Sequence, residues 1–126
     1  YMTELKRITV IDDEPAIREA LVEMLSGAGF DVSSAVNGKE GLVVVSQQHP
    51  DLILLDIMMP EMNGWQVLEA LKKDDWAKKV PVIILTNLDG VENVSKAVEQ
   101  EAYEYVVKGD TDMKDILAMV KRRLGV

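Results

Sequence analysis

Carboxylates follow two apolar segments of the sequence at the points where those segments end. "RITVI" runs into Asp12 and Asp13, and "LILL" runs into Asp56. If the two segments are neighbouring strands, the three aspartates converge on one small site, where their mutual repulsion favours a bound cation. A set of oxygen ligands without histidine or cysteine favours Mg²⁺ or Mn²⁺ over zinc. We therefore expect a hard divalent cation beside Asp56.

Two other polar residues end apolar segments later in the chain. Thr86 follows "VPVIIL", and Lys108 follows "YEYVV". Lys108 supplies a mobile ammonium that can pair with a carboxylate or a phosphoryl oxygen, and Thr86 supplies a hydroxyl at the same edge. A metal ion, a lysine and a hydroxyl can spread the charge of a transferring phosphoryl group, which a carboxylate can accept as nucleophile. We expect Asp56 to be that nucleophile, because a rigid strand delivers it to this edge.

Short apolar runs alternate along the chain with longer segments in which apolar residues recur at helical spacing. This alternation is typical of βαβ units and a parallel sheet. The predicted strands are 7–11, 31–35, 52–55, 80–86 and 103–107, and the predicted helices lie within 14–30, 37–51, 64–75, 91–102 and 112–124. The sequence therefore predicts a single doubly wound α/β domain. Ligands of such sheets bind beyond the carboxyl ends of the strands, where the polar residues stand.

The second predicted helix conflicts with local propensity. Its run from Val43 to Val45 favours a strand. A helix is still expected, because a connection between parallel strands needs a long crossover, which is usually helical.

Composition narrows the possible functions. With 126 residues, 48% of them hydrophobic, the chain suffices for one domain with a single core. It has no cysteine for a disulfide or a thiolate metal site, and no apolar run approaches the roughly 18 residues of a membrane span. "YMTELKR" lacks the apolar stretch of a secretory signal, so we expect a soluble, cytoplasmic protein, with Tyr1 a cloning remnant. The net charge of -8 opposes direct binding to nucleic acid or to anionic membranes.

Asp12-Asp13, "LDIMMPEMNG", Thr86, Tyr105 and Lys108 stand at intervals that resemble the receiver domain of two-component response regulators, including chemotaxis receivers. The similarity covers essentially the whole chain, residues 1–126. It implies a flavodoxin-like fold with a five-stranded parallel sheet of order 2-1-3-4-5.

The same resemblance implies the chemistry at Asp56. This residue would be phosphorylated from the phosphohistidine of a sensor histidine kinase or of a phosphotransfer protein. Asp13, Asp56 and the backbone carbonyl of Met58 would ligate Mg²⁺, and Asp12 would act through a water molecule. The chain would catalyse only its own phosphorylation and dephosphorylation.

Three residues near the strand ends would respond to the phosphoryl group, again by resemblance. Lys108 and Thr86 would hold its oxygens. Thr86 and Tyr105 look like the pair that moves when a receiver switches, which shifts the population of two conformations. The readout surface would comprise the fourth helix, the fifth strand and the fifth helix, for a downstream effector protein or a fused output domain.

The sequence departs from the usual receiver pattern at several positions. Gly109 follows Lys108 where receivers commonly have a proline, and a glycine frees the loop instead of fixing it. Asn87 stands where a smaller residue is common, which would narrow access to the phosphoryl site. Met58 and Leu88 place apolar side chains where polar ones are frequent. We expect slow dephosphorylation, because apolar walls position the attacking water poorly.

Three alternatives compete with a phosphorylated receiver. Phosphatases of the haloacid dehalogenase type carry a general-acid aspartate two residues after the nucleophile, but that position is Met58 here. Flavodoxin-type flavin binding needs a phosphate loop rich in Ser, Thr and Gly, whereas "DDEPA" would repel the phosphate. A degenerate receiver that binds partners without phosphorylation is permitted by Asn87 and Gly109, although the aspartates and the lysine are intact. This last alternative stays open.

Overall fold

A five-stranded parallel sheet forms the centre of the computed structural model, which describes residues 5–87 and 104–126. The strand order is β2-β1-β3-β4-β5, as the resemblance implies. The strands are β1 (Arg7–Ile11), β2 (Asp31–Ala35), β3 (Leu52–Asp56), β4 (Val82–Thr86) and β5 (Glu104–Val107). The helices are α1 (Pro15–Gly27), α2 (Gly38–Gln48), α3 (Gly64–Lys72) and α5 (Met113–Leu124), with short 3-10 helices η1 (Ala77–Lys79) and η2 (Lys108–Asp110). The predicted doubly wound fold is confirmed.

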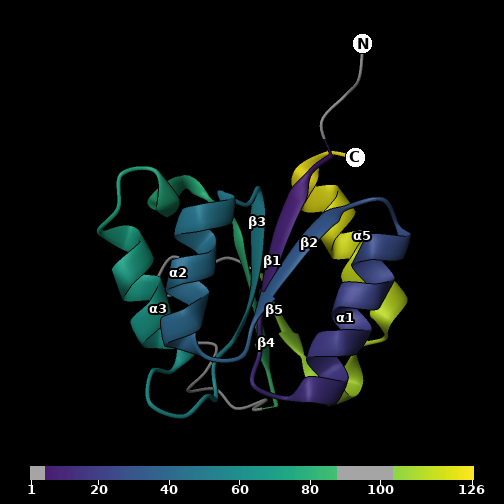
Figure 1. Ribbon diagram of the computed structural model, residues 1–126. Coiled ribbons are helices and arrows are strands. Elements are labelled where there is room, and N and C mark those ends of the chain that lie inside the picture. The colour runs from purple at the N-terminus through teal and green to yellow at the C-terminus, as the bar shows by residue number, and fades with distance from the viewer. Residues whose placement is uncertain (1–4, 88–103) are drawn as a thin grey trace.

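Two layers of helices cover the sheet (Figure 1). Helices α1 and α5 pack on one face and α2 and α3 on the other, so the central strands are buried from both sides. Along β3, Ile53 and Leu55 face the α2 and α3 layer, and Leu52 and Leu54 face the α1 and α5 layer. A strand covered on both faces reads as a continuous apolar run. This burial makes β3 a rigid support for the residue at its end.

Helix α2 forms despite its three consecutive valines. The side chain of Asn37 caps it by accepting a hydrogen bond from the backbone N–H of Glu40 at 2.8 Å. The helix ends at Gln48, and the capping residue that follows, His49, has a φ of 48° in the left-handed region. Burial of Val45 and the cap outweigh a weak intrinsic propensity. The predicted crossover helix is confirmed.

Some boundaries differ from the predicted ones. Helix α3 ends at Lys72, three residues before the predicted end, because the chain turns at Asp74. The Asp74 Oδ1 accepts hydrogen bonds from the backbone N–H groups of Trp76 at 2.9 Å and Ala77 at 3.0 Å. Strand β4 starts at Val82 instead of residue 80, after η1 and Pro81. The predicted helix 91–102 and residue 103 lie outside the described residues.

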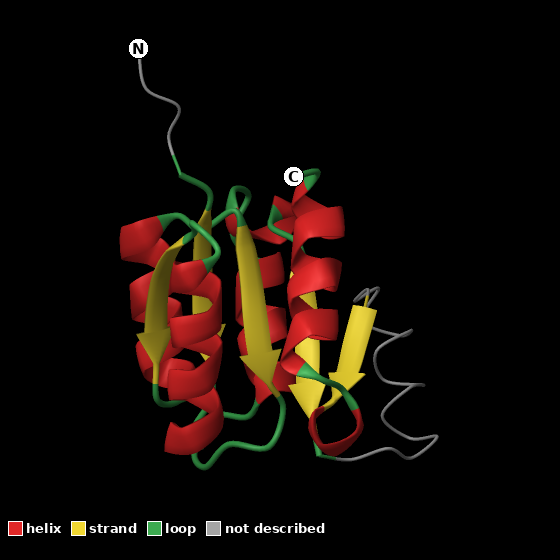
Figure 2. Ribbon diagram, turned by 90° about the vertical axis from the view of Figure 1, so that its right-hand side faces the viewer, coloured by secondary structure: helices red, strands yellow, loops and turns green. Residues whose placement is uncertain are grey.

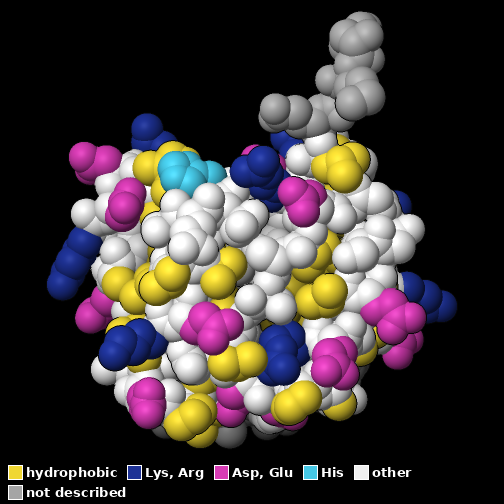
Figure 3. All heavy atoms as spheres, in the orientation of Figure 1, with side chains coloured by type: hydrophobic (Ala, Val, Ile, Leu, Met, Phe, Trp, Pro, Cys, Tyr) yellow, Lys and Arg dark blue, Asp and Glu magenta, His cyan; other side chains and the backbone are white. Residues whose placement is uncertain are grey.

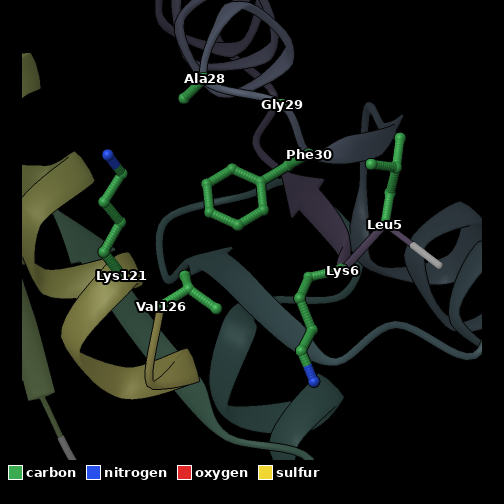
Figure 4. A pocket seen from close by; sticks show the side chains of 7 residues that line it. All are labelled: Leu5, Lys6, Ala28, Gly29, Phe30, Lys121 and Val126. Carbon is green, nitrogen blue, oxygen red and sulfur yellow. The ribbon is translucent and has the colours of Figure 1, made fainter. Parts of the chain in front are cut away.

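The two ends of the sheet are distinct (Figure 2). The strand arrows all point toward one edge, and the described chain starts at Leu5 and ends at Val126 at the other. At the edge with the termini there is an open pocket of about 400 Å³. Figure 4 shows the ring of Phe30 in this pocket, with the side chain of Lys121 on one side of it and that of Lys6, whose ammonium points away from the ring, on the other. Within the described parts of the chain, no helix is long and apolar enough to cross a membrane.

Candidate functional site

The carboxylates predicted to converge do meet at the carboxyl edge of the sheet. Ile11 of β1 pairs with Leu55 of β3, so the residues that follow them, Asp12 and Asp56, stand side by side. Oxygens of Asp12, Asp13, Glu14 and Asp56 lie within 4.8 Å of one another. Asp12 and Asp56 are 0% and 1% exposed. Two strands therefore hold two buried carboxylates at one point.

Lys108 reaches this site from β5, at the far side of the sheet. Its Nζ lies 2.7 Å from Asp12 Oδ2, 2.9 Å from Glu14 Oε1 and 3.4 Å from Asp56 Oδ1. The lysine side chain is only 4% exposed. The predicted partnership of the lysine with the aspartates is thus present in the geometry, and Glu14 joins it. Glu14, the third acid in "DDE", was not among the site residues predicted from the sequence.

Burial, neighbouring charges and hydrogen bonds shift the pKa values of Asp56, Lys108 and Glu14. Burial, and next the charge of Asp12, raise the pKa of Asp56 from 3.8 to about 7, although Lys108 and the N–H of Met58 pull it down. Burial opposes the charge on Lys108, but its hydrogen bonds with Asp12 and Glu14 and the carboxylate charges raise its pKa overall. The hydrogen bond from Lys108 lowers the pKa of Glu14. The site holds more negative charge than its one lysine balances.

The unsatisfied oxygens of the site fit a divalent cation. Among the described residues, the buried atoms Asp12 Oδ2, Asp13 Oδ1 and Asp56 Oδ2 have no hydrogen-bond partner. Asp12 Oδ2 is paired with the Lys108 ammonium, so the other two oxygens are the ones that lack a partner. Buried carboxylate oxygens without donors are costly unless a cation binds. Their oxygen-only chemistry suits Mg²⁺.

Met58 lies beside these oxygens on the loop after β3. Its backbone N–H points to Asp56 Oδ1 at 3.3 Å, and its side chain is exposed. This contact ties the loop to Asp56. Ligation of a metal ion by the Met58 carbonyl stays a prediction.

Thr86 and Tyr105 lie on the same face of the sheet. Thr86 is 1% exposed at the end of β4, and in the register of β4 with β5 Tyr105 pairs with Ile84, two residues earlier. Residues two apart on a strand point to the same face, so Thr86 and Tyr105 are diagonal neighbours. Tyr105 is half-buried against the α2 and α3 layer. The arrangement permits the exchange of space expected of a switching pair.

The two departures beside the site have different consequences. Asn87 follows Thr86, and its Nδ2 donates to Glu14 Oε1 at 3.1 Å. Gly109 lies in η2, where an added Cβ would meet no heavy atom within 4 Å. Lys108 therefore reaches the carboxylates without a proline after it. The contact of Asn87 was not predicted.

Two glycines allow close packing around the loop after β3. A Cβ at Gly64 would lie 2.5 Å from the carbonyl oxygen of Asp56, and one at Gly38 would lie 2.6 Å from that of Met62. Contacts this short with backbone atoms force a shift. The first turn of α2 therefore presses on the loop that carries Met58. Sequence reasoning missed Gly38, for which the only signal was its place after a capping asparagine.

Comparison with known proteins identifies the family. Residues 8–121 match the response regulator receiver domain, and the chain belongs to this family. The solved chemotaxis protein CheY4 of Vibrio cholerae superposes with a TM-score of 0.88 at 25% identity, over 94% of this chain and 98% of that one. Response regulator receivers act in two-component signalling and bind Mg²⁺ at an acidic pocket, the place that the aspartates occupy here.

Full-length relatives are longer than this chain. The DNA-binding dual master transcriptional regulator RpaA of Synechocystis is 36% identical over 95% of this chain and 49% of its own length. The DNA-binding response regulator MtrA of Mycolicibacterium smegmatis is 38% identical over 97% of this chain and 52% of its own. The chain thus spans about half the length of these relatives.

Proposed function

We propose that this chain is a phosphoacceptor whose nucleophile is Asp56. A carboxylate oxygen of Asp56 attacks the phosphorus of a partner's phosphohistidine, the P–N bond breaks, and the imidazole leaves as a neutral ring after gaining a proton. The product is an acyl phosphate on Asp56. One observation carries this proposal: buried Asp56 lies 3.4 Å from the Lys108 ammonium and beside oxygens that lack a partner.

Different residues around Asp56 would bind the metal ion and the phosphoryl oxygens. Asp13, Asp56 and the Met58 carbonyl would hold Mg²⁺ directly, and Asp12 would hold it through water; Mn²⁺ satisfies the same ligands. When bound, the cation neutralises charge on the carboxylates and the incoming phosphoryl oxygens. Lys108 is already fixed in the site and supplies the second positive charge. The Thr86 hydroxyl would donate a hydrogen bond to a phosphoryl oxygen.

The conformational response would involve Thr86 and Tyr105, which are diagonal neighbours on β4 and β5. When the phosphoryl group draws Thr86 in, the space that Thr86 leaves becomes available to Tyr105 on the same face. The readout surface would include β5 and α5. The fourth helix of this surface lies outside the described residues.

Receiver domains pair with histidine kinases and output domains. For this chain the partners would be a sensor histidine kinase or phosphotransfer protein upstream, and an effector protein or fused output domain downstream. The names of RpaA and MtrA describe DNA binding by proteins about twice as long. With a net charge of -8, this chain itself would bind neither nucleic acid nor membrane and would act in the cytoplasm. On the face over α2, Figure 3 shows acidic, basic and hydrophobic side chains mixed together, with no basic patch gathered there.

The test is covalent labelling by a small phosphodonor. Wild type, Asp56→Asn and the control Asp75→Asn are incubated with acetyl phosphate and Mg²⁺, and intact mass is measured. Asp75 is a suitable control because its side chain is fully exposed, away from the site. We expect one phosphoryl adduct that needs Mg²⁺, persists in the control and is absent from Asp56→Asn. A folded wild type that gains no adduct would instead favour a degenerate receiver that binds partners without phosphorylation.

A further inference from the structure

Glu14 lies across the carboxylate site but has no part in the proposed phosphotransfer. Its Oε1 accepts from Lys108 Nζ at 2.9 Å and from Asn87 Nδ2 at 3.1 Å. The side chain is 43% exposed, whereas the Lys108 side chain beneath it is 4% exposed. These three residues, here named the Glu14 bridge, join the segments that follow β1, β4 and β5. The bridge thus links three strand ends over the site.

Within the bridge, the Lys108 ammonium contacts Glu14 more closely than it contacts Asp56. The ammonium of a lysine has three N–H donors, and Lys108 contacts three carboxylates. Its distance to Glu14 is 2.9 Å, against 3.4 Å to Asp56. A phosphoryl group on Asp56 brings oxygens that need this ammonium. Because its donors are already engaged, Lys108 must release one carboxylate, and the exposed Glu14 is the one that can move into solvent.

Glu14 also adds unfavourable charge at the place where a phosphodonor arrives. A carboxylate oxygen of Glu14 lies within 4.8 Å of one from each of the three aspartates. At such distances a unit charge acts strongly on an incoming anion, even where solvent screens it. Glu14 therefore opposes phosphorylation in two ways, by pairing with Lys108 and by repelling the donor.

We propose that Glu14, held by Asn87, is a positioning residue that restrains Lys108 in the unphosphorylated chain and must be released for Asp56 to accept a phosphoryl group. Asn87 directly follows Thr86, so a movement of Thr86 toward the phosphoryl group also displaces the donor that holds Glu14. Release of the bridge and the switch are then a single linked event. This inference rests on the proposed function of Asp56.

The test compares rates of phosphorylation with acetyl phosphate and saturating Mg²⁺, followed by intact mass. Glu14→Gln removes the charge and leaves only a neutral amide oxygen, which is a weaker acceptor for Lys108, and we expect a rate about three- to tenfold faster. Asn87→Ala leaves the charge but frees Glu14, and we expect about a twofold gain. The control Glu19→Gln makes the same charge change at an exposed position of α1 and should leave the rate unchanged.

A second substitution of Glu14 distinguishes the effect of its position from the effect of its charge. Glu14→Asp keeps the charge on a side chain shorter by one methylene, which cannot span to Lys108 and Asn87 together. We expect it to be faster than wild type. If Glu14→Gln is fast and Glu14→Asp equals wild type, charge alone acts and the positioning role is wrong.

A binding measurement gives a readout that does not depend on turnover. Beryllofluoride, an anionic phosphoryl mimic, is titrated with Mg²⁺ present, and binding is followed by tryptophan fluorescence. We expect Glu14→Gln to bind it more tightly by a factor similar to its rate gain. Rates and affinities of Glu14→Gln that match Glu19→Gln would overturn the inference while labelling of wild type stands. Absence of any Asp56-dependent adduct on wild type would instead remove the proposed function itself.

Discussion

Replacing Asp56 with asparagine should stabilise the metal-free protein at neutral and alkaline pH. Burial and the neighbouring Asp12 raise the pKa of Asp56 from 3.8 to about 7. Between these two pH values the folded chain binds more protons than the unfolded chain, so the free energy of unfolding falls as pH rises. Above pH 7 Asp56 is ionised in both the folded and the unfolded chain, and the full free-energy cost of holding its charge in the buried site lowers the stability. Below pH 3.8 both are protonated and no penalty exists.

The size of this stabilisation follows from the difference of about three units between the pKa of Asp56 in the unfolded chain and in the folded chain. Each unit corresponds to about 1.36 kcal/mol, which sets an upper limit on the order of 4 kcal/mol. Asparagine cannot ionise and resembles the protonated carboxyl in shape. We therefore expect Asp56→Asn to raise the free energy of unfolding by about 2–4 kcal/mol at pH 8, and to leave it nearly unchanged near pH 4.

Denaturant unfolding in a chelator at several pH values measures this directly. Asp75→Asn, at a fully exposed position, is the control and should stay within about 0.5 kcal/mol of wild type at every pH. Saturating Mg²⁺ should stabilise wild type more than Asp56→Asn, because it binds the folded state through the ionised carboxylate. A variant that is less stable than wild type at pH 8, or a gain that does not change with pH, would refute the assignment of charge strain to Asp56.

Three further changes test other parts of the site. Lys108→Ala should destabilise the metal-free protein by about 3 kcal/mol in denaturant unfolding, because it leaves buried Asp12 and Asp56 without a cation; a loss below about 1 kcal/mol would contradict this. Gly38→Ala should weaken Mg²⁺ binding several-fold in a fluorescence titration and cost about 1–3 kcal/mol of stability, because its Cβ would lie 2.6 Å from the Met62 carbonyl. The matched control Gly27→Ala, with no atom within 4 Å of its Cβ, should change neither quantity for the worse. Met58→Asn should shorten the lifetime of the acyl phosphate, because an amide can position water where a thioether does not; an unchanged decay of the adduct mass would argue against the expected slow dephosphorylation.

The sequence predicted the parts of the site that strands control. Apolar runs define where β1, β3, β4 and β5 end, so the convergence of Asp12, Asp56, Thr86 and Lys108 at one edge followed from βαβ topology. The order of the strands did not follow from periodicity and came from resemblance to a family. Pairing of β1 with β3 depends on contacts between segments far apart in sequence, which no local pattern encodes.

The parts that the sequence did not predict depend on side chains meeting across loops. The contact of Asn87 with Glu14 joins residues 73 positions apart, and neither residue has a local feature that indicates the other. Gly38 is required by the approach of a backbone carbonyl from another loop. The early end of α3 has a local cause in Asp74, whose side chain accepts from two backbone N–H groups. An aspartate at that place is ambiguous between a helix interior and a turn.

The separation of the two sheet edges has a practical consequence for handling this protein. Leu5 and Val126 both line the pocket at one edge, whereas Asp56 stands at the other. A fluorescent protein, an affinity tag or a surface tether joined at either end would start from the edge opposite Asp56. Immobilised or fused forms should thus keep the edge that carries Asp56 free of the attached group, so the proposed phosphorylation of Asp56 can be followed in such forms.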